Sequence, residues 1–322
     1  MDLTLEVEST PLEPRAIEIS VKGSWVTVPA INIAGHTVIT TGKLLRIAAI
    51  NDHYWMEHDI DNPDLYIERL NRSGSSRPDI FTFLNRLPET LVRYPYRFTL
   101  NSNAVVSLTT YDEWLKKLST DTRRNIKLSK NRGVVTKVQS LSEDLIQGIV
   151  AINNETPIRA GKRFWHYGKN VDAVMRDYSS FAERSEYMCA YFGDELIGFV
   201  KIVYCGKIAA IMQNLAMIAH RDKKPSAALM AKAVERCIEK GLSYLTYLQY
   251  RYGTKQDDSL TEFKRRCGFE EIFTPQYYVP LTIKGRVALA SGLHRPLGEI
   301  LPGPVMIGLL RLRKAWYDSM NK

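Results

Sequence analysis

One stretch of the chain, from residue 187 to residue 269, constrains the fold most because it sets the order of six elements. Two runs of apolar residues flank the turn Gly193-Asp194-Glu195, which predicts a β-hairpin. A strand, a basic loop, a helix, a strand and a short helix are predicted next, over residues 208–217, 219–224, 225–241, 244–250 and 259–267. A last strand is predicted over 277–281. The pattern indicates an α/β (α+β) protein whose central sheet is mixed, mainly antiparallel and flanked by helices.

The residues before this stretch predict further short strands and helices. Alternating apolar residues between 17 and 49, and the runs 79–84 and 104–108, predict strands. Asn62 followed by Pro63 predicts a helix start, because asparagine caps a helix and proline fits its first turn. Capping-box spacings at 110–113 and 140–143 open further helices, the first divided near Ser119 and ended by Gly133. A strand over 134–138 and a helix over 171–181 complete this part.

The charge of the chain points to an anionic partner. It carries 44 Lys and Arg against 35 Asp and Glu, a formal net charge of +9. Residues 115–135 hold seven bases and one acid, so the basic surface is local. Nucleic acid, a phosphorylated cofactor and an anionic membrane surface all fit this charge. If the partner is RNA, the expected contacts are Arg123, Arg124, Lys127 and Lys130.

Several classes of protein are not indicated. The cysteines are far apart, which predicts buried small side chains and no zinc site, at Cys189, Cys205, Cys237 and Cys267. His53, Glu57 and His58 lack the H-E-x-x-H order, so no metal is expected there. Without a signal-peptide pattern or an apolar run of about 20 residues, a cytoplasmic protein is expected.

The loop before Pro225 can hold phosphate. A helix N-terminus presents unpaired N–H groups and a positive dipole end to an anion. The expected contacts are Arg221, Lys223, Lys224 and Ser226, with Gln213 and Asn214 on the preceding strand. The alternative is a solvated basic loop before an ordinary core helix.

A second loop, residues 154–168, is rich in side chains that recognise ligands. Glu155 or His166 could take a proton from an acceptor, while Arg159, Arg163 and Tyr167 could bind it. The alternative is that Phe164 and Trp165 are core and the arginines are their solvated neighbours. The tyrosines at the end of the strand 244–250, Tyr250 and Tyr252, are further candidates to contact the substrate.

The segment Phe263-Lys264-Arg265-Arg266-Cys267-Gly268-Phe269-Glu270, with the elements before it, resembles the Gcn5-related N-acetyltransferase (GNAT) superfamily. The Phe-Lys pair and the basic helices resemble its Fem-type branch and the related acetyltransferase-like proteins of polysaccharide loci. The resemblance covers residues 110–282. It departs from the superfamily twice: the loop 219–226 has no glycine, and Lys264 replaces the usual tyrosine acid.

The resemblance implies three units: an N-terminal lobe over 1–135 that can hold a degenerate first GNAT-like unit, an acyltransferase domain over 136–282, and a helical tail over 283–322. It implies acyl transfer from acyl-coenzyme A to an amine or hydroxyl of a cell-envelope or polysaccharide precursor. Lys264 would then stabilise the oxyanion and leaving group, without a metal. DNA is not an expected partner.

Two other functions are also compatible with these residues. One is a Fem-type aminoacyl transferase that uses aminoacyl-tRNA, and the other is a catalytically silent binding module with the same fold. The tail, apolar at helical spacing and basic at its end, could pack on the domain or lie on the inner face of a membrane.

Overall fold

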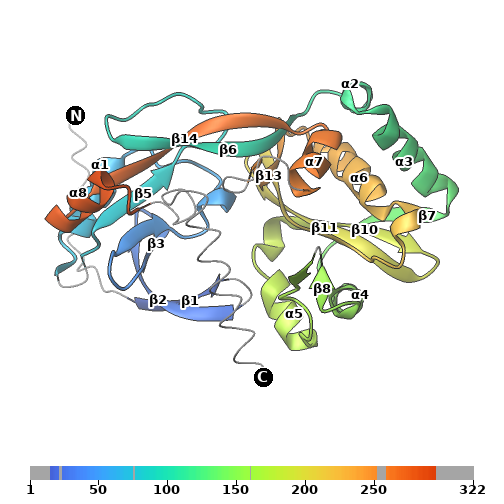
Figure 1. Cartoon of the computed structure of the whole chain (residues 1–322), viewed down its shortest axis with the longest axis horizontal. Helices are drawn as coiled ribbons and strands as arrows, with labels where there is room; N and C mark the ends of the chain where they lie inside the picture. The colour runs from blue at the N-terminus through green and yellow to red at the C-terminus, as the bar shows by residue number, and fades with distance from the viewer. Residues whose placement is uncertain (1–14, 22–23, 75–76, 160, 252–258, 295–322) are drawn as a thin grey trace, which may run out of the picture.

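Twelve strands form one continuous sheet in the computed structural model, which describes residues 15–21, 24–74, 77–159, 161–251 and 259–294 (Figure 1). In spatial order they are β1 (Arg15–Val21), β2 (Ser24–Ile33), β3 (His36–Thr41), β4 (Ile47–Ile50), β5 (Ile80–Leu84), β14 (Glu270–Pro280), β6 (Arg97–Ser107), β13 (Tyr244–Gln249), β12 (Ile208–Ala216), β11 (Glu195–Cys205), β10 (Ser185–Phe192) and β7 (Val134–Gln139). Two short strands, β8 (Ile158–Arg159) and β9 (Lys162–Arg163), pair separately. The expected mixed, mainly antiparallel sheet is confirmed.

The sheet consists of two halves of six strands each, and the pattern of parallel and antiparallel pairs in one half mirrors that in the other about the centre of the sheet. Each half has a single parallel pair, β4 with β5 and β12 with β13, and the other pairs are antiparallel. A helix joins the two strands of each parallel pair, α1 (Pro63–Asn71) in the first half and α6 (Pro225–Glu239) in the second. The halves meet where β14 pairs with β6, from Glu270 opposite Val105 to Tyr278 opposite Arg97. The two halves exchange these strands. β14, from the C-terminal part of the chain, completes the first half, and β6, from the N-terminal part, completes the second.

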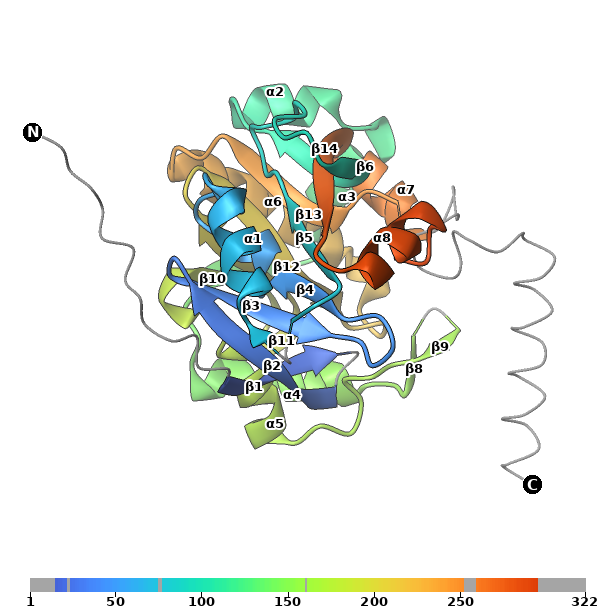
Figure 2. The same cartoon turned by 90° about the vertical axis from the view of Figure 1, so that its left-hand side faces the viewer.

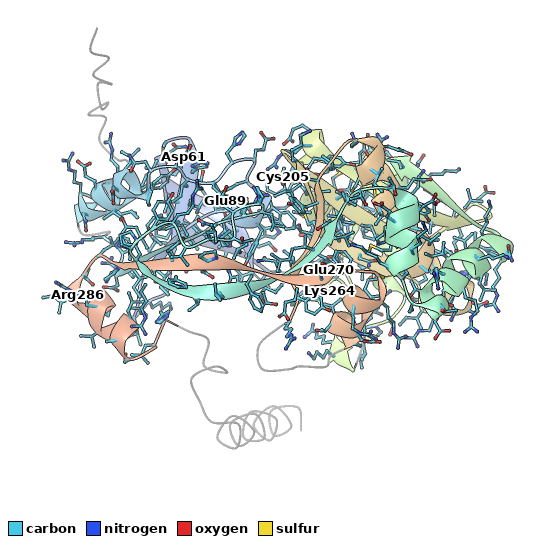
Figure 3. The ribbon with its side chains drawn as sticks, turned by 90° about the horizontal axis from the view of Figure 1, so that it is seen from above. Asp61, Glu89, Cys205, Lys264, Glu270 and Arg286 are labelled. Atoms are coloured by element: carbon cyan, nitrogen blue, oxygen red, sulfur yellow. The ribbon has the colours of Figure 1, made fainter. Side chains whose placement is uncertain are left out.

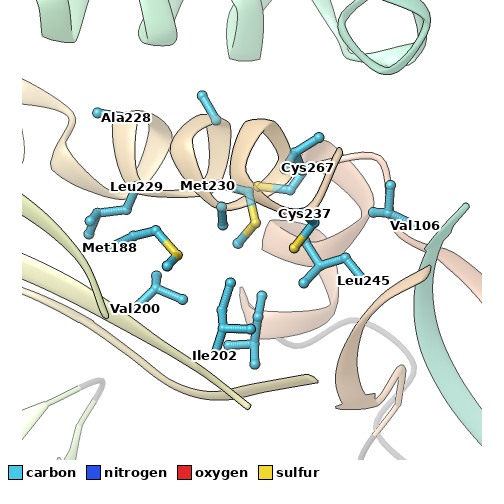
Figure 4. Packing of buried hydrophobic residues seen from close by; sticks show 14 of the residues in the cluster. Val106, Met188, Val200, Ile202, Ala228, Leu229, Met230, Cys237, Leu245 and Cys267 are labelled. Carbon is cyan, nitrogen blue, oxygen red and sulfur yellow. The ribbon is translucent and has the colours of Figure 1, made fainter. Parts of the chain in front are cut away.

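Helices cover the second half on both faces. On one face lie α2 (Tyr111–Lys117), α3 (Thr120–Asn131), α6 and α7 (Ser259–Arg266), and on the other α4 (Glu143–Asn154) and α5 (Val171–Tyr178). Figure 4 shows Val200 and Ile202 of β11 facing Met230 of α6 across the core. This burial of apolar surface stabilises the helix-on-sheet layer.

The first half has its own core. Figure 2 shows α1 in front of this part of the sheet and α8 (Ile283–Ala290) beside it. Tyr66 of α1 stacks on Phe81, and Phe81 stacks on Phe83. Phe83 in turn stacks on Tyr277 of β14, at 5.0 Å between ring centroids. The core of the first half therefore includes residues from near the end of the chain.

Packing explains why residue 268, within the segment from Phe263 to Glu270, is a glycine. Gly268 has a φ of +80°, and a Cβ there would approach Leu118 at 3.1 Å and the Trp114 ring nitrogen at 3.2 Å. Trp114 Nε1 donates to the carbonyl of Cys267 at 3.1 Å. Glycine is needed because it permits this conformation and this close approach.

Most predicted elements are confirmed, with three differences. Strand β6 begins at Arg97 and β14 at Glu270, earlier than predicted, because the two strands extend by pairing with each other. Helix α4 is capped by the Ser142 side chain, so its start is two residues later than the capping box implied. All four cysteines are buried thiols, as predicted.

The division of the chain after residue 135 stays a prediction. Helices α2 and α3 precede that point, yet both contact α6, and Trp114 and Leu118 lie in the core beneath it. No helix in the described ranges is long and apolar enough to cross a membrane.

Candidate active site

The sheet opens between β12 and β13. The two strands pair only at Ile208–Tyr244, Ala209–Leu245 and Ala210–Thr246 and then separate. A bulge in β12 falls at Met212, because Lys201 pairs with Gln213 and Ile202 with Ile211. In β13, Leu248 has a φ of +48° where the pairing with β6 shifts. Irregularities in both strands thus coincide with the opening.

A cavity of about 540 Å³, the α6 cavity, lies at this opening. It extends from β12 and β13 to the start of α6 and is bordered by α3 and α7. Its lining includes Thr122, Asn125, Arg159, Asn214, Arg221, Lys224, Ser226, Tyr247, Phe263 and Arg266. Four of these are cationic and no carboxylate is among the residues that line it. The cavity is therefore suited to an anionic ligand.

In the loop before α6, the groups available to an anion are mainly side chains. The N–H groups of Lys223, Lys224 and Ala227 already donate to His220, Arg221 and Lys224 carbonyls, respectively. Lys224 has a φ of +57° and provides no side-chain cap for the helix. These observations fit the absence of glycine in the loop. The side chains of Arg221, Lys224 and Ser226 are suited to phosphate, while few backbone N–H groups are free to surround it.

Glu155, which the sequence suggested as a general base, makes its contacts with backbone N–H groups and an arginine. Its carboxylate accepts the N–H groups of Ile218 and Ala219 at 2.8 and 2.7 Å. It also pairs with Arg159 at 3.0 Å. Its oxygens therefore hold the chain between β12 and α6.

Arg159 fixes the same segment. Its guanidinium donates to the carbonyl of Ala216 at 2.8 Å and to that of Ile152 at 2.9 Å. It lies over the Phe164 ring at 4.9 Å and borders the α6 cavity. The Glu155–Arg159 pair thus links the end of α4 to the segment between β12 and α6.

A second cavity, of about 470 Å³, lies on the opposite face of β12 and is called the α5 cavity here. Both halves of the molecule contribute to it, through Glu18, Ile19, Ser20, Trp25, Asn51, Asp52, Trp55, Trp165, His166, Asp177, Tyr178, Ser180, Phe181, Met212 and Gln213. Its lining contains three carboxylates and no lysine or arginine. The charged side chains that line the two cavities are therefore of opposite sign, on the two faces of β12.

His166 is the group in the α5 cavity best suited to accept a proton. Its Nδ1 lies 3.9 Å from the Asp177 carboxylate, which in turn binds Lys169 at 2.6 Å. Burial, aided by the charge of Lys169, lowers the pKa of His166 to about 4, against an opposing effect of Asp177. The imidazole is therefore neutral at pH 7 and able to act as a base.

Lys264 is fully buried on α7 (Figure 3). Its ammonium donates to the carbonyl of Gln249 and lies 4.8 Å from the centre of the Tyr247 ring. Tyr247, not Lys264, lines the α6 cavity. The structure thus places the lysine behind the cavity wall, where it stabilises the irregular end of β13.

The remaining predicted residues have varied surroundings. Gln213 and Asn214 line the α5 and α6 cavities respectively, so β12 contributes to both. Lys223 lies 4.6 Å from the Phe192 ring centre and outside the lining of the α6 cavity. Arg163 and Tyr167 are exposed and do not line either cavity.

Tyr250 is buried, and burial raises the pKa of its hydroxyl. Tyr252 and the tail beyond residue 294 lie outside the described residues. The four basic residues of α3, Arg123, Arg124, Lys127 and Lys130, are exposed, while Thr122 and Asn125 of the same helix line the α6 cavity. In the described part, no group of three or more His, Cys, Asp or Glu side chains could hold a metal ion.

Sequence reasoning missed Asp52, Asp177 and Lys201. Asp52 follows β4, and only the fold brings it to the α5 cavity. Lys201 is fully buried in β11 and donates to the Tyr178 and Ser180 carbonyls at 2.8 and 2.6 Å. Burial lowers its pKa to about 8. The sequence held one signal for Lys201, because a lysine within the otherwise apolar strand 195–205 indicates a buried charge.

No protein-family model matches the chain, and no curated protein matches it. Among solved structures it is similar to FemX, with a TM-score of 0.55, 10% identity, and coverage of 87% of this chain and 90% of that one. It is similar to the C-terminal domain of a putative lysylphosphatidylglycerol synthetase from Agrobacterium fabrum, with a TM-score of 0.54, 13% identity, and coverage of 83% and 88%. It is also similar to L-PGS from Bacillus licheniformis, with a TM-score of 0.52, 12% identity, and coverage of 82% of this chain and 88% of that one. The chain therefore shares its fold with these structures, which agrees with the GNAT-like, Fem-type resemblance of its sequence.

Proposed function

We propose that the chain is a transferase that moves an acyl or aminoacyl group from a phosphate-bearing donor to an amine or hydroxyl acceptor. The charge contrast across β12 carries this proposal. The α6 cavity has four cationic lining residues and no carboxylate, whereas the α5 cavity has three carboxylates and no lysine or arginine. An anionic donor and a separate acceptor would therefore approach the same strand from opposite faces.

In this mechanism the acceptor nitrogen or oxygen attacks the acyl carbon from the α5 cavity. A C–N or C–O bond forms, and the bond from the acyl carbon to the donor sulfur or oxygen breaks. His166 takes the proton that the acceptor loses and passes it, directly or through water, to the leaving atom. Asn214, which lines the α6 cavity, and the backbone that is unpaired where β12 and β13 separate would stabilise the oxyanion.

Acyl-coenzyme A is the first donor we propose. Its phosphates would be held by Arg221, Lys224 and Ser226 at the start of α6, and its acyl arm would extend along β12 toward Asn214. These residues supply binding and orientation, and the thioester supplies the activated acyl group.

Aminoacyl-tRNA is the second donor, and one observation favours it. Helix α3 borders the α6 cavity with Thr122 and Asn125 and exposes Arg123, Arg124, Lys127 and Lys130 to solvent. These cations could bind the RNA backbone while the aminoacyl end enters the cavity. The solved structures of similar fold include FemX and L-PGS, which is why this donor is tested beside the first.

For the acceptor we propose a precursor of the cell envelope or of a polysaccharide. The α5 cavity supports this proposal because it combines aromatic rings with polar side chains, including Trp55, Trp165, Asn51 and Gln213.

The test is a transfer assay with a panel of acyl-coenzyme A donors, read by thiol release, beside charged tRNAs, read by loss of the aminoacyl ester. Wild type is compared with His166→Gln and with His58→Gln, an exposed histidine that lines neither cavity. We expect turnover with one donor class, a rate at least about 100-fold lower in His166→Gln, and no change in His58→Gln.

If tRNA is the donor, binding should weaken steeply with salt and depend less on salt in the Arg123→Gln/Arg124→Gln variant. Salt-insensitive binding would exclude this donor. No turnover with any donor would overturn the transferase proposal in favour of a silent binding module, and equal turnover in wild type and His166→Gln would remove the base assignment.

A further inference from the structure

We propose that the acceptor is an amino sugar, whose primary ammonium group binds in the α5 cavity beside Asp52. This inference rests on the proposed function, because it names the acceptor class of the same site. Its basis is the combination, within one cavity, of a carboxylate that forms no ion pair with the described residues, aromatic faces and a neutral imidazole.

The three carboxylates of the cavity differ in their partners. Glu18 pairs with Arg176 at 2.6 Å, and Asp177 pairs with Lys169 at 2.6 Å. Asp52 instead accepts a hydrogen bond from the neutral amide of Asn51 at 2.7 Å. Asp52 is an exposed residue. Partial desolvation raises the pKa of its carboxylate, while the charge of Arg184 and the hydrogen bond from Asn51 lower it. Because the Asn51 amide is neutral, a cationic ligand beside Asp52 would supply the positive charge that this hydrogen-bond partner lacks.

Aromatic side chains supply the second part of the site. Trp25, Trp55, Trp165 and Phe181 line the cavity, and the side chain of Trp165 is 55% exposed. Such rings can cover the C–H face of a sugar and attract an ammonium group through their π electrons. Trp25 already binds a cation in this way, since the guanidinium of Arg176 lies 4.1 Å from its ring centre.

Polar groups complete a lining suited to a hydroxylated ring. Ser20 and Asn51 come from the first half of the molecule, and Ser180 and Gln213 from the second. These hydroxyl and amide groups can both donate to and accept from sugar hydroxyls. A purely aliphatic amine would leave them without partners, which favours the amino sugar.

The neutral state of His166 suits a cationic ligand. Its pKa of about 4 removes the charge that would repel an ammonium group at pH 7. The same imidazole can accept the proton that the amine loses as the C–N bond forms. Binding and proton transfer therefore require the same protonation state of this residue.

The inference is tested by binding alone, with the donor omitted. The full chain is titrated with glucosamine and with glucose at pH 7, and binding is followed by tryptophan fluorescence and by calorimetry. These sugars differ in one ammonium or hydroxyl group. We expect glucosamine to bind about tenfold more tightly than glucose.

The variant Asp52→Asn should lose most of this preference, about five- to tenfold, and keep the fold, because asparagine tolerates the φ of +59° at this position. The matched control is Glu57→Gln, an exposed carboxylate that does not line the cavity. Its preference should equal that of wild type.

Equal binding of both sugars by wild type, or a full preference in Asp52→Asn, would overturn the inference. Binding of cadaverine without binding of glucosamine would overturn the assignment of a sugar. Because no donor is present, these outcomes are independent of turnover. Transfer to a hydroxyl acceptor without glucosamine binding would keep the proposed function and remove this inference. Glucosamine binding without transfer to any acceptor would keep the α5 cavity as an amino-sugar site and remove the proposed function.

Discussion

The carboxylate of Glu155 accepts the backbone N–H of Ala219 at 2.7 Å, a contact between residues 64 positions apart. The same carboxylate accepts the N–H of Ile218 and pairs with Arg159. A residue at the end of α4 thus sets the path of the chain from β12 to α6. The α5 and α6 cavities share that strand, so this contact links the supports of both.

Replacing Glu155 with glutamine should destabilise this segment. The amide has one oxygen in place of two, and its NH₂ group would face an N–H donor. We expect the free energy of unfolding to fall by about 1–3 kcal/mol and donor affinity to fall with it. Denaturant titration and donor binding measure the two effects.

The control for this variant is Glu143→Gln, an exposed carboxylate at the other end of α4. It should change stability by less than about 0.5 kcal/mol. Wild-type stability in Glu155→Gln, together with loss of the acidic limb of the rate profile, would instead identify Glu155 as a base.

Lys264→Ala should unfold more readily than wild type. The substitution removes the donor to the Gln249 carbonyl and the cation over Tyr247, and it leaves a space in the core. We expect a loss of about 2–4 kcal/mol, against almost none for the exposed Lys116→Ala. Thermal and denaturant unfolding provide the measurement. Unchanged stability with turnover abolished would support the direct chemical role that the sequence suggested.

The elements of this fold were predictable where their signals are local. Asn62 caps α1 and Thr110 caps α2 through side-chain hydrogen bonds to residues three positions ahead, which the sequence alone can indicate. The extra length of β6 and β14 was not predictable in this way. It depends on pairing between segments about 170 residues apart, such as Ser102 with Phe273.

The site shows the same limit. The cations before α6 and the histidine in the loop could be named as candidates because their residue types suggest chemistry. The contacts of Glu155 and Lys264 could not be predicted, because their partners are backbone groups that only the folded chain brings near them. Asp52 could not be singled out from the sequence, because only the fold brings it to the α5 cavity.

The protein should lose stability as the pH falls from about 6.5 toward 4. The pKa of His166 and that of His53 are each lowered by burial from 6.5 to about 4. Between these values the unfolded chain binds protons that the folded chain does not, so the free energy of unfolding rises with pH. The stabilisation is complete above 6.5 and is lost as the pH falls through this window.

Denaturant titrations at pH 7 and pH 4.5 measure this dependence. The variant His166→Gln should show a smaller difference between the two pH values than wild type, by on the order of 1–3 kcal/mol. The exposed His58→Gln should keep the full difference. An unchanged pH dependence in His166→Gln would mean that the imidazole is protonated as easily in the folded protein as in the unfolded chain.

Arg176→Ala should loosen the hairpin of β1 and β2 from the second half of the molecule. Figure 1 shows these strands and α5 along the same edge, and Arg176 joins them through Glu18 at 2.6 Å and the Trp25 ring at 4.1 Å. Because these groups are partly exposed, global stability should change by less than about 1 kcal/mol. Amide hydrogen exchange should nevertheless rise in residues 15–21 and 24–28, relative to an Arg72→Ala control that removes an exposed ion pair at the end of α1. Unchanged exchange in both variants would show that the hairpin is held by its strand pairing alone, and that Arg176 does not close the wall of the α5 cavity.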